Sequence, residues 1–173
     1  MTEWLTFLPR RGVFLDLGCG AGQDARYLTR RGHRVVGLDR TMPLLQFATR
    51  QSPFVPLVLA DIRALPIRAD SIDGIWAAAS LIHCPKRHMT GVLAALRHLV
   101  KPKGVLAATL TYGSLSGTKR TGWMPGRYVA RWRKDEFARM LCRAGWTVLS
   151  LRVVDNQERK GRWLNVIAMR ARG

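Results

Sequence analysis

The 173-residue sequence predicts a single domain of the α/β class, in which helices cover a mostly parallel β-sheet. Apolar runs of strand length alternate along the chain with segments of helical periodicity, and this alternation is typical of parallel sheets. A hydrophobic content of 47% is enough for one core at this length. No run approaches the roughly 18–20 apolar residues of a membrane span. We therefore expect one domain, residues 1–173, without a membrane segment.

Seven strands and four helices follow from these patterns. We expect strands at 12–17, 33–38, 55–60, 72–78, 103–111, 146–154 and 162–170. We expect helices at 22–31, 42–50, 86–100 and 134–144. In the third helix, Val92, Leu93 and Leu96 recur at helical spacing, and Pro102 with Gly104 should stop it. The last two strands have no helix between them, which predicts an antiparallel pair at the end of the sheet.

The charge and the cysteines restrict the class of protein. A formal charge of +18, from 29 basic and 11 acidic residues, would attract nucleic acid, anionic membranes or acidic small molecules. A bias of composition explains the charge equally well. Cys19, Cys84 and Cys142 form neither a disulfide framework nor a metal pattern, so we expect no metal site. Because the N-terminus also lacks the order of a signal peptide, we expect a cytoplasmic protein.

A glycine-rich loop, 13-VFLDLGCGAG-22, follows the first predicted strand. Such loops usually bind phosphate, but the third glycine comes one residue too early for a dinucleotide fingerprint. Asp16 would also repel a pyrophosphate. S-adenosylmethionine carries an ammonium, a sulfonium and an unphosphorylated ribose, so it suits a loop that has a carboxylate beside it. The cofactor contacts expected here are Asp16, Gly18, Cys19 and Gly20.

Two further aspartates end the second and third strands. Asp39 lies about twenty residues after the loop, where a carboxylate can accept hydrogen bonds from ribose hydroxyls. Asp61 can accept from the adenine amino group while Ile62 covers the ring. Arg40 is assigned to the same site. Each feature alone could be a tight turn or a helix cap, but the three carboxylates together predict a cofactor site at the carboxyl ends of the strands.

Five segments resemble the class I S-adenosylmethionine-dependent methyltransferases, in the subgroup called type 11. These are 14-FLDLGCGAG-22, 35-VVGLD-39, 60-ADIRALP-66, 70-DSIDGIWAAASLIHCPK-86 and 97-RHLVKPKGVLAATL-110. The resemblance implies a Rossmann-like three-layer sandwich whose seven-stranded, mostly parallel sheet has an antiparallel last strand. It also implies that Ile62 flanks adenine and that Ala77 and Ala78 run beside the methionine part of the cofactor.

The chain departs from this family at the segment that covers the site. Only nine residues precede Arg10, so residues 1–11 would form a shortened N-terminal cap. Residues 113–133 are the candidate replacement, a substrate lid rich in glycine, basic and aromatic residues. Glycines allow hinge-like changes, and Trp123, Tyr128 and Trp132 would exclude water. The alternative is a solvated loop.

Several side chains are candidates for contacts with the acceptor. Arg127 and Arg131 would grip a carboxylate or a phosphate, although a solvated face is equally compatible with the pattern. Tyr112 and Trp163 are further candidates, the latter also as a core residue. His83 follows the fourth strand and is the candidate general base if the acceptor must lose a proton. Otherwise it has a structural role, as does Cys84.

Three functions are therefore compatible with the sequence. The first is methyl transfer to a small molecule, and the arginines favour an anionic one. The second is methylation of RNA, because 127-RYVARWRKDEF-137 resembles wobble-uridine transfer-RNA methyltransferases and aromatic residues among arginines can stack on bases. The third is a non-catalytic scaffold that keeps the cofactor pocket. A continuous basic face running into the pocket would favour RNA.

Overall fold

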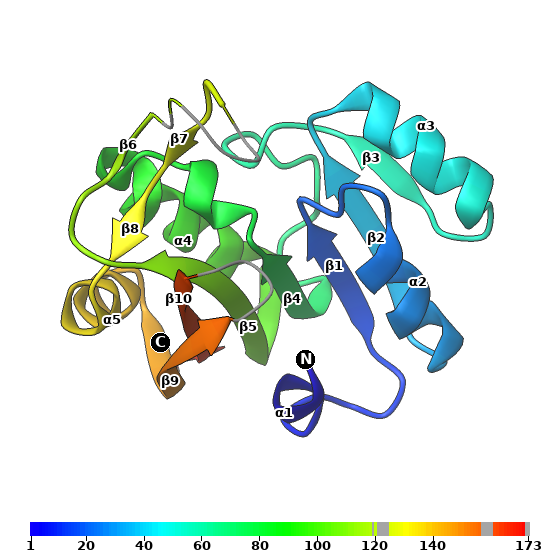
Figure 1. Cartoon of the computed structure of the whole chain (residues 1–173). Coiled ribbons are helices and arrows are strands. Elements are labelled where there is room, and N and C mark those ends of the chain that lie inside the picture. The colour runs from blue at the N-terminus through cyan, green and yellow to red at the C-terminus, as the bar shows by residue number, and fades with distance from the viewer. Residues whose placement is uncertain (119, 121–124, 157–160, 172–173) are drawn as a thin grey trace.

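The computed structural model describes residues 1–118, 120, 125–156 and 161–171, and its centre is one sheet in which seven strands form a continuous path and an eighth, two-residue strand lies off this path (Figure 1). The strands run in the order β3-β2-β1-β4-β5-β10-β9. Their bounds are β1 Val13–Leu17, β2 Arg34–Asp39, β3 Leu57–Leu59, β4 Ile72–Ala78, β5 Val100–Tyr112, β9 Trp146–Asn156 and β10 Gly161–Arg170. The first five are parallel, and β10 is antiparallel to both β5 and β9. The predicted sheet, including its antiparallel C-terminal pair, is confirmed.

Helices cover both faces of this sheet and complete the three predicted layers. They are α2 Gln23–Arg30, α3 Met42–Gln51, α4 Lys86–Leu99 and α5 Lys134–Arg143. One hydrophobic core contains the apolar faces of α4 and α5, with Leu93, Leu96 and Phe137 fully buried. The other core lies under α2 and the N-terminal segment and contains Trp4 and Leu28. No helix in the described part of the chain is long and apolar enough to cross a membrane.

The junction between α4 and β5 has no loop. The helix ends at Leu99, as the proline and glycine that follow predict, but β5 begins at the next residue, three positions earlier than expected. Its first residues are irregular, because the pairing with β4 shifts register and Lys103 has a φ of 66°. The Pro102 segment therefore forms the distorted start of a strand.

Residues 113–133 contain short elements that the sequence analysis did not predict. β6 (Gly117–Thr118) pairs with β7 (Tyr128–Val129), and β8 (Arg131–Trp132) joins the main sheet by pairing with β5. Trp132 is fully buried and Tyr128 is half-buried. The alternative of a solvated loop is thus wrong for residues 128–132, because strand pairing and the burial of their side chains hold them in place. Trp123 lies outside the described residues.

The N-terminal segment packs on the sheet through one aromatic side chain. Trp4, on the short helix α1 (Thr2–Leu5), is 1% exposed, and its ring centroid lies 5.1 Å from Phe14 and 5.5 Å from Trp76. Its Nε1–H donates to the carbonyl of Val105 at 3.3 Å. A Cβ on Gly74 would lie only 2.7 Å from this ring, so glycine makes room for it. Trp4 therefore anchors the N-terminal segment in the core.

We expect Trp4→Ala to lower the free energy of unfolding by about 3–5 kcal/mol, because it opens a cavity and leaves the Val105 carbonyl without its donor. Phe7→Ala is the matched control, since Phe7 is 45% exposed and should change stability by no more than about 0.5 kcal/mol. Denaturant unfolding measures both. Equal losses in the two variants would contradict the packing role of α1.

Candidate active site

A cavity of about 1270 Å³ opens at the carboxyl ends of β1, β2 and β4. Its volume exceeds the roughly 300–1,000 Å³ of an ordinary ligand site, so it has room for two molecules. Most of the residues predicted from the sequence line it. They are Asp16, Gly18, Cys19, Gly20, Asp39, Arg40, Asp61, Ile62, Ala78, His83, Arg127 and Trp163.

Three predicted site residues do not line this cavity. Ala77 is fully buried in the core on the α4 side, because alternation along β4 turns Ala78 to the cavity and Ala77 away from it. The ring of Tyr112 lies under the Arg162 guanidinium at 4.6 Å. The side chain of Arg131 donates to the carbonyl of Tyr112 at 3.4 Å. These three side chains therefore make contacts within the protein and do not face the cavity.

The glycine loop is folded tightly between two strand ends. Gly18 has a φ of 72°, and its N–H donates to the carbonyl of Leu38 at 2.7 Å. A Cβ on Gly18 would lie 2.3 Å from the Cβ of Ser80, so no other residue fits without displacing the segment after β4. The loop backbone therefore forms the floor of the cavity.

The Asp39 carboxylate joins this loop to the end of β2. Its Oδ2 accepts from the N–H of Gly20 at 2.9 Å, and its Oδ1 accepts from the N–H of Thr41 at 2.8 Å. Each carboxylate oxygen has further acceptor capacity. Asp39 is thus held in one orientation and can still accept hydrogen bonds from a pair of hydroxyls.

Asp61 lies at the cavity rim in an ion pair. The Arg63 guanidinium donates from Nε to Oδ1 at 2.9 Å and from Nη2 to Oδ2 at 2.8 Å. These hydrogen bonds lower the pKa of Asp61 to about 2. The carboxylate is therefore ionised at neutral pH, and Arg63 fixes its direction.

Asp16 is the most unusual carboxyl group of the site. It is 2% exposed, and burial, with a smaller contribution from Asp24, raises its pKa to about 8. Among the described residues, its Oδ2 and the Oγ of Ser80 have no hydrogen-bond partner. Buried polar atoms without partners at a cavity wall mark the place where a ligand supplies donors. A ligand ammonium fits this place, because it would both donate to Asp16 and stabilise its ionised form.

Acidic and basic side chains both line the cavity, and Arg40 and Arg63 lie close to its carboxylates. Asp16 and Asp39 at the ends of β1 and β2, with Asp24 on α2, are called the acidic wall. The basic wall comes from the start of α4 and the residue before β7, and consists of Arg87, His88 and Arg127. Sequence reasoning missed Arg87 and His88, although the basic triplet at 86–88 directly follows the strand-end motif. It also missed Asp24 and Ser80, which had no distinguishing pattern.

His83 and Cys84 lie near the basic wall. The Nδ1 of His83 lies 2.9 Å from the carbonyl oxygen of Tyr128, and because a carbonyl only accepts, Nδ1 carries the proton. Burial raises the pKa of Cys84, so this residue is a neutral thiol at pH 7 and a poor nucleophile.

The family described as "Methyltransferase domain" matches residues 15–108, more than half of the chain. The chain therefore belongs to the class I S-adenosylmethionine-dependent methyltransferases, through this domain. S-adenosylmethionine is the cofactor of this class. The unpartnered oxygen of Asp16 suits its ammonium group, and the oriented carboxylate of Asp39 suits its ribose. The glycine loop lets the cofactor approach the backbone closely.

Curated relatives match this chain over about 60% of its length. The malonyl-[acyl-carrier protein] O-methyltransferase of Salmonella typhimurium is 38% identical over 114 residues, which are 64% of this chain and 45% of that protein. The trans-aconitate 2-methyltransferase of Azoarcus is 40% identical over 102 residues, 58% of this chain and 39% of that protein. The chain thus spans less than half the length of these relatives.

Solved structures share the fold over nearly the whole chain. A S-adenosylmethionine-dependent methyltransferase from Methanosarcina mazei has a TM-score of 0.85 at 15% identity, covering 97% of this chain and 96% of its own. The 1,6-didemethyltoxoflavin-N1-methyltransferase of Burkholderia thailandensis, solved with S-adenosylhomocysteine, has a TM-score of 0.84 at 22% identity, covering 99% and 76%. These similarities confirm the predicted architecture.

We expect Asp39→Ala to weaken S-adenosylhomocysteine binding about tenfold to a hundredfold, because the variant loses a charged acceptor for the ribose and the link to Gly20. Isothermal calorimetry measures the affinity. Asp135→Ala is the control, since Asp135 is an exposed aspartate on α5. Unchanged affinity in the Asp39 variant would remove this residue from ribose recognition.

The raised pKa of Asp16 predicts a pH dependence. Because the ligand ammonium pairs with the ionised carboxylate, affinity for S-adenosylhomocysteine should rise up to about tenfold per pH unit as the pH approaches 8. In the ligand-free protein the native state keeps a proton that the unfolded chain releases. The free energy of unfolding should therefore fall as the pH rises from about 4 to 8.

Asp16→Asn should abolish the pH dependence of the affinity and that of the free energy of unfolding, whereas Asp135→Asn should keep both. Calorimetry and denaturant unfolding across this pH range provide the measurements. A wild-type affinity that does not change with pH would show that Asp16 does not pair with the ligand.

Proposed function

We propose that this chain transfers the methyl group of S-adenosylmethionine to a carboxylate oxygen of a small anionic acceptor. The observation that carries the proposal is that acidic side chains near the ends of β1 and β2 and basic side chains at the start of α4 and before β7 line the same large cavity. The acidic wall suits a cationic cofactor, and the basic wall suits an anionic acceptor. Arginine favours a carboxylate in particular, because its planar fork can bind both oxygens.

The relatives support the same acceptor chemistry. The Salmonella and Azoarcus proteins are named for malonyl-[acyl-carrier protein] and trans-aconitate, and both molecules carry carboxylate groups. They differ in size, so the shared feature is the charge of the acceptor. The basic wall here, at Arg87, His88 and Arg127, is the part of the cavity suited to such a group.

A carboxylate acceptor alters the task of the protein. Bound S-adenosylmethionine supplies an electrophilic methyl group, and an attacking carboxylate oxygen forms the new bond to carbon as the carbon–sulfur electron pair returns to sulfur. A carboxylate is already ionised at neutral pH, so no general base is required. Asp16 and Asp39 hold one reactant, while Arg87 and Arg127 orient the other and displace its water. Positioning then supplies the catalysis.

The test incubates the purified protein with labelled S-adenosylmethionine and three probes: trans-aconitate, malonyl-coenzyme A and bulk transfer RNA. We expect methyl esters of the carboxylate probes. They are recognised because mild alkali hydrolyses them and releases the label as methanol. Arg127→Ala should raise the acceptor KM about tenfold or more with unchanged affinity for S-adenosylhomocysteine, because it removes a charged contact to the acceptor only.

Arg139→Ala, which changes an exposed arginine on α5, is the matched control and should behave as wild type. Labelling of transfer RNA alone would replace the proposal by RNA methylation. Cofactor binding without turnover on any probe would favour a scaffold.

A further inference from the structure

We propose that His83 is a positioning residue: its Nδ1–H fastens the segment 126–133, called the strap, so that Arg127 lies at the cavity. The inference rests on the proposed function for the role of Arg127, but the contact itself does not. The Nδ1 of His83 lies 2.9 Å from the carbonyl oxygen of Tyr128. This hydrogen bond joins η1 (Leu81–His83), which follows β4, to a segment 45 positions later in the chain.

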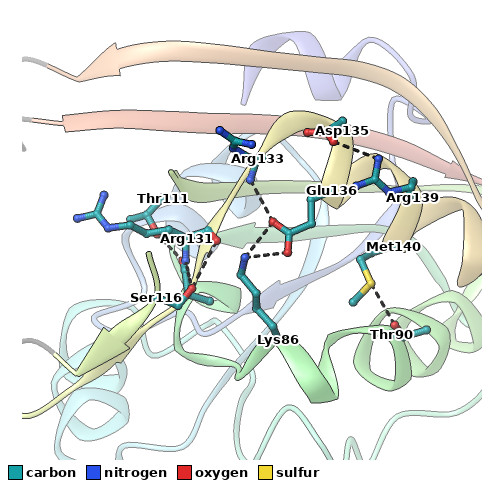
Figure 2. A network of polar contacts seen from close by, with 11 residues as sticks. Lys86, Thr90, Thr111, Ser116, Arg131, Arg133, Asp135, Glu136, Arg139 and Met140 are labelled. Atoms are coloured by element: carbon teal, nitrogen blue, oxygen red, sulfur yellow. Dashed lines mark hydrogen bonds and ion pairs between the residues drawn. The ribbon is translucent and has the colours of Figure 1, made fainter. Parts of the chain in front are cut away.

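The second half of the strap is anchored without His83. The N–H of Ala130 donates to the carbonyl of Ile82 at 2.7 Å, and its own carbonyl accepts from the Thr111 hydroxyl at 2.6 Å. The N–H of Arg131 donates to the Oγ of Ser116 at 2.9 Å. Figure 2 shows Thr111, Ser116 and Arg131 gathered at this point.

A second set of contacts ties the end of the strap to α4. Lys86 donates to both carboxylate oxygens of Glu136, at 2.8 and 2.9 Å, and Glu136 also accepts from the N–H of Arg133 (Figure 2). The ammonium of Lys86 lies 4.7 Å from the ring centre of Trp132, which is fully buried. Residues 130–133 are therefore fixed to the body of the protein.

The first half of the strap lies at the cavity and has fewer attachments. Gly126, Arg127 and Tyr128 line the cavity wall. Within the described residues, β7 pairs only with β6, whose two residues are exposed, and these two strands form a separate sheet. The side chains of Tyr128 and Val129 pack on the core. The hydrogen bond of His83 holds the carbonyl between these two residues against η1.

The chemistry of this contact separates a positioning role from a general base. A carbonyl needs a donor, so any side chain with an N–H at the position of Nδ1 can hold the strap. An asparagine amide supplies that donor but cannot accept a proton from an acceptor molecule. His83→Asn and His83→Ala therefore distinguish the two roles.

The first measurement is hydrogen exchange of the ligand-free protein over residues 126–129. We expect these amides to exchange about tenfold faster in His83→Ala and at close to the wild-type rate in His83→Asn, because only the alanine variant lacks the donor. His98→Ala, a change of an exposed histidine on α4, is the control and should match wild type. Unchanged exchange in the alanine variant overturns the inference, whatever the acceptor is.

The second measurement is turnover with trans-aconitate. We expect His83→Ala to raise the acceptor KM about tenfold, with S-adenosylhomocysteine affinity unchanged, and His83→Asn to restore most of the loss. If both variants lose kcat equally and KM is unchanged, His83 is a general base and the inference is wrong. If exchange responds as expected but no carboxylate probe turns over, the strap contact stands and the proposed acceptor fails.

Discussion

The close approach of the glycine loop to the segment after β4 is the constraint on which the site depends. The backbone at Gly18 meets Ser80 at a distance that leaves no room for a side chain, and its N–H is bound to the end of β2. Three strand ends are thereby drawn to one point. This convergence buries Asp16 and orients Asp39 through Gly20. The shape of the backbone thus determines the electrostatics of the cavity.

The distribution of charge gives the large net charge a physical meaning. Only 11 residues of the chain are acidic, yet Asp16, Asp24, Asp39 and Asp61 all line one cavity. Several of the other acidic side chains are paired with arginine or lysine at the surface, as in Asp73 with Lys101 and Asp135 with Arg139. The same cavity is also lined by Arg40, Arg63, Arg87 and Arg127, so the acidic groups face basic ones and a ligand meets both signs of charge there.

Much of the fold could be predicted from local patterns, and the failures have physical causes. The strands and helices have periodic apolar faces, and the three aspartates stand at strand ends, so topology alone brings Asp16, Asp39 and Asp61 together. The strands β6, β7 and β8 have two residues each, and their pairing depends on distant partners such as Thr111. The resemblance places both Ala77 and Ala78 in the site, because a sequence motif does not specify which face of the strand each side chain occupies. In the structure, adjacent side chains of the strand point to opposite faces, so only Ala78 reaches the cavity.

The absence of a loop between α4 and β5 has a mechanical consequence for recognition. The helix that carries Arg87 and His88 in its first turn continues at its other end directly into a central strand, and its apolar face is buried in the core, so the helix is fixed to the sheet. Arg127 is held instead by a peptide with few attachments. One side of the proposed acceptor site is thus rigid, and the other is held less firmly. Basic side chains on a rigid helix favour acceptors whose anionic groups lie at one fixed spacing. A basic side chain on a less firmly held peptide can adapt to acceptors of different length.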